Sequence, residues 1–438
     1  MMEKSKIDSL VEDVVVSSDV KKKETAINAI WNAAYEEGVY PASIHDLYKA
    51  RGEGKWSGTT VPAMNLRSLT FDLARAIFRE ALKINAGAFI FEIARSEMGY
   101  TDQKPLEYTT VILAAALREG YKGPVFIQGD HFQVNAKNYK DNPKAEVDGL
   151  KKLIKESIDA GFYNIDIDSS TVVDLSKTDL LQQQELNSAI CAELTAYIRQ
   201  LQPKGIDVSV GGEIGEVGSK NSTPEDLNAF MKLYLEKLPK GLEGISKISV
   251  QTGTSHGGVV LPDGTMATVN LDFNVLKIIS EAAKREFGLA GAVQHGASTL
   301  PESAFHKFPE VETAEVHLAT QFQNMIFDSK FFPQDLKKKI YGWLKVEAKS
   351  ELKPGMTDDQ FFYKARKKAL GPFKKDIMSV GDREKIAAEI EKTFAFLFGQ
   401  LKIKDSAHLV AKFIKPVNVK KSFDLTHDKK TEAFEGDD

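Results

Sequence analysis

Residues 123–131, GPVFIQGDH, show the pattern that decides the fold of this chain. A short apolar run begins after a Gly-Pro pair and ends in an acid followed by a histidine. Its length and its bounding residues are typical of a buried β-strand. Because the same pattern recurs on both sides of this stretch, its repetition predicts the architecture of the chain.

Eight apolar runs of this kind lie between residues 59 and 320. They are TTVPAMN (59–65), AGAFIFEI (86–93), GPVFIQGD (123–130), YNIDID (163–168), IDVSVGGE (206–213), ISKISVQTG (245–253), AGAVQHG (290–296) and TAEVHLAT (313–320). The segments between them space their apolar residues three to four positions apart, as amphipathic helices do. One of these segments opens with STPED at 222–226, which combines a capping residue, a first-turn proline and two acids.

Alternation of strands and helices predicts a parallel sheet, and eight strand–helix units predict a (β/α)8 TIM barrel of the α/β class. A doubly wound open sheet is the structural alternative. We expect a helical N-terminal extension, the catalytic barrel, a helical C-terminal extension and a polar, frayed tail. The predicted boundaries of these parts are 1–57, 58–332, 333–415 and 416–438.

The composition narrows the classes of function. The chain has 438 residues, 42% of them hydrophobic, and a formal charge of 58 − 62 = −4. This balance argues against nucleic-acid binding, which usually needs a basic excess. No apolar run is long enough for a signal peptide or a membrane span, so we expect no membrane association. The single cysteine, Cys191, excludes an internal disulfide and a thiolate metal cage, and it fits the cytoplasm.

Polar residues gather at the ends of the predicted strands, where the active site of such a barrel lies. Four of the eight histidines and two acids stand there. They are His131, His256, His295, His317, Asp130 and Glu213. Three imidazoles, with or without a carboxylate, form a catalytic zinc site that keeps one position open for substrate. We expect His131, His256 and His295 to be the ligands.

Asp130 has two interpretations that its spacing leaves equal. It could orient a metal-bound imidazole from outside the coordination sphere, or it could act as a general acid and base beside the metal.

Small residues follow two of these histidines. Gly257 comes after His256, and Gly296 and Ser298 come after His295. Such loops let backbone N–H groups approach a phosphate, while simple turn chemistry is the alternative explanation. GGEIGEVG at 211–218 is not a dinucleotide fingerprint, and no Walker lysine pattern is present, which argues against nucleotide binding.

Taken in order and spacing, the motifs VPAMN, GDH, GGEIGEVG, TSHGG, QHGAST and EVHLAT resemble those of the class II, zinc-dependent ketose-bisphosphate aldolases. That family includes the fructose- and tagatose-bisphosphate enzymes. The resemblance extends over about residues 59–325 and implies a TIM barrel, a divalent metal (zinc or another) and a sugar-phosphate substrate. A monovalent cation near the phosphate is implied as well.

The resemblance assigns roles to the matching residues. Asp130 corresponds to the proton donor to the leaving aldehyde oxygen, and His131, His256 and His295 correspond to the zinc ligands. Glu213 corresponds to a carboxylate at the zinc site, with a catalytic role. Gly257, Gly296 and Ser298 correspond to the phosphate region, and Asn65 corresponds to an asparagine beside the active site.

The last predicted strand departs from the family pattern. His317 stands where the family has asparagine, Ala319 stands where it has aspartate, and Thr320 is retained. His317 and Thr320 remain candidates for contact with the substrate. The metal set therefore matches better than the substrate set, which suggests a changed sugar phosphate or acceptor aldehyde.

These observations predict a metal-dependent aldolase that cleaves or forms a ketose bisphosphate such as fructose 1,6-bisphosphate. Dihydroxyacetone phosphate and an aldehyde would be the products. Two alternatives stay open: a non-catalytic barrel subunit that supports a partner aldolase, and a metal-dependent isomerase or epimerase of sugar phosphates. We expect a homo-oligomer, a dimer or a tetramer.

Overall fold

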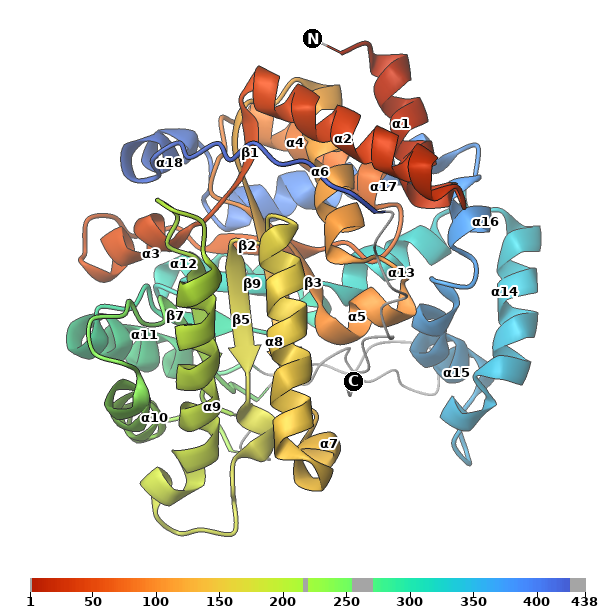
Figure 1. Cartoon of the computed structure of the whole chain (residues 1–438). Coiled ribbons are helices and arrows are strands. Elements are labelled where there is room, and N and C mark those ends of the chain that lie inside the picture. The colour runs from red at the N-terminus through yellow and green to blue at the C-terminus, as the bar shows by residue number, and fades with distance from the viewer. Residues whose placement is uncertain (1, 216–219, 254–270, 426–438) are drawn as a thin grey trace.

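The chain folds around a closed barrel of parallel strands. A computed structural model describes residues 2–215, 220–253 and 271–425 (Figure 1). Within these residues nine strands form one sheet in the order β1-β4-β3-β2-β9-β8-β7-β6-β5, and β4 also pairs with β5. That additional pairing closes β2 to β9 into an eight-stranded barrel, so the predicted (β/α)8 fold is confirmed.

Each of the eight predicted apolar runs contains one barrel strand. The strands are β2 (Val61–Asn65), β3 (Ile90–Ala94), β4 (Gly123–Gln133), β5 (Asn164–Asp168), β6 (Ser209–Glu213), β7 (Lys247–Ser249), β8 (Ala292–Gln294) and β9 (Glu315–Leu318). The helices between and after them are α4 (Thr70–Lys83), α5 (Arg95–Tyr100), α6 (Pro105–Glu119), α7 (Ala136–Asp141), α8 (Pro143–Asp159), α9 (Leu180–Leu201), α10 (Pro224–Lys237), α11 (Phe273–Phe287), α12 (Lys307–Glu310) and α13 (Thr320–Asp328).

The N-terminal extension contains one strand that we did not predict. It comprises α1 (Lys4–Val16), α2 (Val20–Glu37), β1 (Val39–Ala42) and α3 (His45–Gly52). β1 pairs with β4 just before the point where β5 begins to do so. The side chain of Asn164 joins β5 to β1 and the residues after it. Its Nδ2 donates to Ala42 O at 3.2 Å, and its Oδ1 accepts from Ile44 N at 2.8 Å. Four residues that include a proline carry too little pattern to be recognised as a strand.

Helix α3 closes the end of the barrel at which the strands begin. The buried guanidinium of Arg51 donates to the backbone oxygens of Thr59, Ala290 and Thr313, which lie just before β2, β8 and β9. Tyr48 of the same helix is fully buried and donates its hydroxyl hydrogen to Glu315 inside the barrel. Helix α3 thus covers the end of the barrel at which the strands begin, opposite to the end that carries the predicted site residues.

The C-terminal extension packs on the outside of the barrel. It contains α14 (Gln334–Glu347), α15 (Asp358–Ala365), α16 (Lys374–Met378), α17 (Arg383–Gln400) and α18 (Ala407–Phe413). Residues 416–425 differ from the expected frayed tail, since they lie against the N-terminal helices (Figure 1). The Phe423 ring lies 5.0 Å from that of Trp31, and Asn28 Oδ1 accepts from Phe423 N at 2.9 Å.

The barrel interior carries a polar layer, whereas such interiors are usually filled by branched apolar residues. Lys247 of β7 is 1% exposed. Its Nζ lies 2.7 Å from Gln128 Oε1, 2.9 Å from Asp166 Oδ2 and 2.5 Å from Glu315 Oε1. Burial alone would raise the pKa of Glu315, but Lys247 and His317 lower it to about 2. The ammonium group thus joins β4, β5, β7 and β9.

We predict that Lys247→Met lowers the free energy of unfolding by about 3–5 kcal/mol, because removal of one partner leaves buried carboxylates uncompensated. Chemical denaturation measures the change. Lys155→Met is the control, since its ion pair with Asp159 at 2.5 Å is exposed and contributes at most about 1 kcal/mol. Equal stability of the two variants would contradict a structural role for the buried ammonium.

Candidate active site

Two site residues project from a bulge in β4. The pairing of β4 with β5 shifts register between Gly129 and Phe132, and His131 adopts a positive φ of 39°. A bulge changes the direction of neighbouring side chains, which lets Asp130 and His131 both reach the site. Gly129 is required here, because a Cβ atom at that position would lie 2.4 Å from the Phe132 ring.

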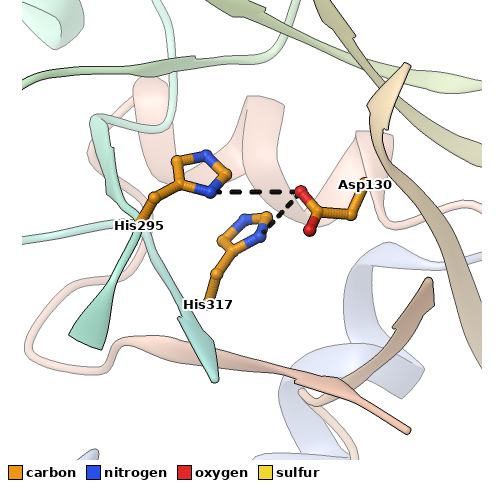
Figure 2. A group of neighbouring side chains, drawn as sticks. All are labelled: Asp130, His295 and His317. Atoms are coloured by element: carbon orange, nitrogen blue, oxygen red, sulfur yellow. Dashed lines mark ion pairs between the residues drawn. The ribbon is translucent and has the colours of Figure 1, made fainter. Parts of the chain in front are cut away.

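Three histidines from β4, β9 and the residue that follows β8 lie close together. The ring centroids of His131 and His295 are 4.2 Å apart, and those of His295 and His317 are 4.0 Å apart. The Asp130 carboxylate faces His295 and His317 (Figure 2), with its Oδ1 3.2 Å from His317 Nδ1 and 4.0 Å from His295 Nδ1. Residues that are more than 180 positions apart in the sequence therefore form one cluster.

The predicted metal ligands within the described residues come together. One ligand atom each from His131, Glu213 and His295 lies within 4.8 Å of the others. Imidazole nitrogens with a carboxylate oxygen are a donor set that suits zinc and related divalent ions. His256, the fourth predicted ligand, lies outside the described residues. The residues that are described fit a divalent metal.

Two polar side chains that we did not single out support these histidines. Asp168 Oδ2, at the end of β5, lies 3.0 Å from His131 Nδ1, and Ser249 Oγ, at the end of β7, lies 2.9 Å from His295 Nε2. Burial alone would raise the pKa of the Asp168 carboxyl, but hydrogen bonds from His131, Ser170 and Gln133 lower it. Such partners fix the orientation of metal-binding imidazoles.

Glu213 is in a different electrostatic environment. Its Oε2 lies 3.5 Å from His131 Nδ1. Burial, assisted by the charge of Asp168, raises the pKa of the Glu213 carboxyl to about 8. Burial therefore favours the protonated form of this carboxyl.

His317 lies deeper than expected for a residue that contacts substrate. It is 4% exposed, with Nδ1 2.9 Å from Glu92 Oε2 and Nε2 2.7 Å from Glu315 Oε1. Glu315 also binds Lys247, so His317 connects the polar layer to Asp130. In this position the imidazole can orient Asp130 from the side of the barrel interior.

The predicted phosphate contacts meet where β8 and β9 end. Gly296 has a positive φ of 69°, and Ser298 Oγ accepts a hydrogen bond from the backbone N–H of Ala319 at 2.8 Å. Thr320 is the first residue of α13. Gly257 lies outside the described residues. Asn65 is 1% exposed, and its Nδ2 donates to Glu97 Oε2 at 2.6 Å.

A comparison of sequences matches residues 47–383 to the family described as class-II fructose-bisphosphate aldolase. No curated protein matches the chain. Within the described residues, no helix has both the length and the apolar character needed to cross a bilayer.

Several solved structures have similar folds. A fructuronate-tagaturonate epimerase from Cohnella laeviribosi is 12% identical with a TM-score of 0.57, and 90% of each chain is covered. A probable tagatose 6 phosphate kinase from Sinorhizobium meliloti is 13% identical with a TM-score of 0.56, covering 80% of this chain and 100% of that one. A fructose-bisphosphate aldolase from Campylobacter jejuni is 17% identical with a TM-score of 0.45, covering 84% and 97%. At these identities, the first two show the fold alone.

We predict that Asp168→Asn weakens the affinity for a divalent metal by about 10- to 100-fold, because His131 loses the charge that orients its ring. Competition with a chromophoric chelator measures the dissociation constant. Asp159→Asn, a change in an exposed ion pair on α8, is the control. Unchanged affinity in Asp168→Asn would show that His131 needs no such partner.

Proposed function

This chain belongs to the class-II fructose-bisphosphate aldolase family, and on that premise we propose that it is a metal-dependent aldolase for a ketose bisphosphate such as fructose 1,6-bisphosphate. In the cleavage direction it would release dihydroxyacetone phosphate and an aldehyde. The observation that carries this proposal is the convergence of His131, Glu213 and His295 at the open end of the barrel.

In this proposal, His131, His256, His295 and Glu213 hold the metal. Zinc, the metal generally used in this family, would act as a Lewis acid on the ketose carbonyl and stabilise the negative charge that develops when the bond breaks. Ser249 and Asp168 keep two of the imidazoles oriented, since both contact ring nitrogens at 2.9–3.0 Å.

Asp130 transfers the proton on the aldehyde side of the bond. Its carboxylate is buried beside three imidazoles and supported from below by His317, so it is held in one position. Fixed geometry of this kind favours proton transfer at a defined atom. Glu213, whose Oε2 lies 3.5 Å from His131 Nδ1, would transfer the proton on the dihydroxyacetone phosphate side.

The phosphate would bind between the ends of β8 and β9. Gly296 lets the backbone approach closely, while Ser298 and Thr320 supply hydroxyl groups at the start of α13. Gly257 belongs to the same proposed set, with a monovalent cation as an additional counterion. Asn65 acts through Glu97 rather than by direct contact, because it is buried.

We further propose a cytoplasmic homo-oligomer, a dimer or a tetramer, that works on small sugar phosphates. Membership of the family supports the sugar-phosphate substrate.

A second candidate is epimerisation or isomerisation of a sugar phosphate at the same metal site. The observation that favours it is His317, which brings an imidazole to within 3.2 Å of Asp130 where the family pattern has an amide. An additional acid–base pair of this kind would suit proton transfer without bond cleavage. Product analysis separates the two reactions.

We predict that the purified protein releases triose phosphate from fructose 1,6-bisphosphate or tagatose 1,6-bisphosphate, and that a chelator abolishes the release. Coupled triose-phosphate detection and metal analysis provide the measurements. Cleavage that resists chelation would refute the metal mechanism. Full metal occupancy with a rearranged sugar as the product would favour the second candidate, whereas low metal content and activity only with a partner would identify a supporting subunit.

We predict opposite behaviour for two site variants. His256→Ala should lose metal and activity together, because it removes a ligand. Asp130→Ala should keep its metal but lose turnover by about 10²- to 10⁴-fold, the usual contribution of a general acid. Metal content and kcat are measured on the same preparations. Full activity of Asp130→Ala would overturn its assigned role.

A further inference from the structure

We propose that Arg67, in the loop after β2, is a specificity-determining residue that binds the phosphate of the substrate. This inference rests on the proposed function and adds to it: the substrate is selected as a phosphorylated ketose by a guanidinium group. Nothing in the motifs of the sequence singles out this arginine, and the case for it comes from its place in the fold.

Arg67 is held in a defined orientation at the open end of the barrel. Its Nη2 lies 2.5 Å from Glu97 Oε1. The other oxygen of Glu97 accepts from Asn65 Nδ2 at 2.6 Å and from Ala94 N at 2.7 Å. The backbone oxygen of Arg67 accepts from Gln103 Nε2 at 3.0 Å. A guanidinium that is oriented in advance loses little conformational entropy when a ligand binds.

The guanidinium lies beside the proposed phosphate contacts. Arg67 Nη1 is 3.5 Å from the Thr320 hydroxyl oxygen, at the start of α13. This contact follows from the barrel, since β2 and β9 are neighbours with Met64 opposite Leu318. Ser298 reaches the same edge through its contact with Ala319 N. Arg67 therefore adds a cationic group to the proposed phosphate contacts, which are Gly296, Ser298 and Thr320.

Charge gives the physical reason for this role. The buried acidic side chains of Glu92, Asp130 and Asp168 lie among the histidines at the centre of the site, so a cation at the edge offers the phosphate dianion a separate partner. A planar guanidinium can bind two phosphate oxygens at once, which makes arginine well suited to this ligand. The Arg67 side chain is 13% exposed, and its Nη1 is the guanidinium nitrogen that faces Thr320.

Arg95, the arginine that follows β3, is placed differently. Its Nη1 lies 2.5 Å from Glu146 Oε1 and donates to the backbone oxygen of Gln133 at 2.7 Å. Glu146 also accepts from Asn135 N, so this group joins the segments after β3 and β4. Arg95 thus makes structural contacts to the segments after β3 and β4, whereas Arg67 contacts Thr320.

The test compares donors with and without phosphate in the condensation direction. Parent, Arg67→Lys and Arg67→Gln proteins are assayed with dihydroxyacetone phosphate and with dihydroxyacetone, each with the same aldehyde. We expect Arg67→Gln to raise KM for dihydroxyacetone phosphate about 10- to 100-fold, as loss of a charge-assisted hydrogen bond does. KM for dihydroxyacetone should stay within about twofold, and Arg67→Lys should fall between. Arg79→Gln, which removes an ion pair between Arg79 of α4 and Glu391 of α17, is the matched control.

Two results would overturn the proposal. One is an equal loss with both donors in Arg67→Gln, which would mean that the arginine only supports the loop. The other is an unchanged KM for dihydroxyacetone phosphate. If the parent protein condenses neither donor, the proposed function has failed, and calorimetry with inorganic phosphate still decides: weaker binding to Arg67→Gln supports the phosphate role, and equal binding overturns it.

Discussion

A single ammonium group inside the barrel pairs the buried polar groups on which the candidate active site rests. Lys247 contacts Gln128, Asp166 and Glu315, and so joins four of the eight barrel strands where such interiors are usually apolar. Charges buried at this depth are tolerated only when they are paired. Gly211 of β6 leaves the space for this layer, because a Cβ atom there would lie 2.3 Å from Asp166 Oδ1. Glu315 connects this polar layer to the site, because it contacts His317, and the His317 imidazole in turn contacts Asp130.

The candidate active site, at the carboxyl ends of the strands, is also built from paired polar side chains. Three of the site side chains are held by a polar partner from a neighbouring element: His131 by Asp168 of β5, His295 by Ser249 of β7, and Asn65 by Glu97 of α5. Such partners keep reacting groups in one geometry without contacting the substrate themselves. The proposed phosphate contacts and Arg67 lie at the edge of this arrangement, where β8, β9 and β2 end. In the proposed function, metal binding and proton transfer therefore share the centre of the site, and the phosphate lies at its edge.

Much of the barrel could be predicted because strands and helices leave local signals. Every predicted apolar run contains a barrel strand, whereas β1 was missed because VYPA is short and includes a proline. Among the site residues, His131, His295 and Glu213 could be placed from their positions after strands. Asp168 was available to the same reasoning: in YNIDID the residues Asn164, Asp166 and Asp168 alternate with apolar ones, so they share one face of the strand. That alternation predicts a polar barrel interior, which we did not infer.

By itself, the sequence determined the fold class, the order of the strands along the chain and the candidate metal ligands. Period-two and period-3.6 patterns are properties of neighbouring residues, and an active site at strand ends follows from the barrel. Only the tertiary structure decided which polar groups meet. The choice of Asp168 for His131, the depth of His317 and the approach of Arg67 to Thr320 depend on barrel closure and strand register. Contacts between residues 37 to 253 positions apart leave no trace in local sequence.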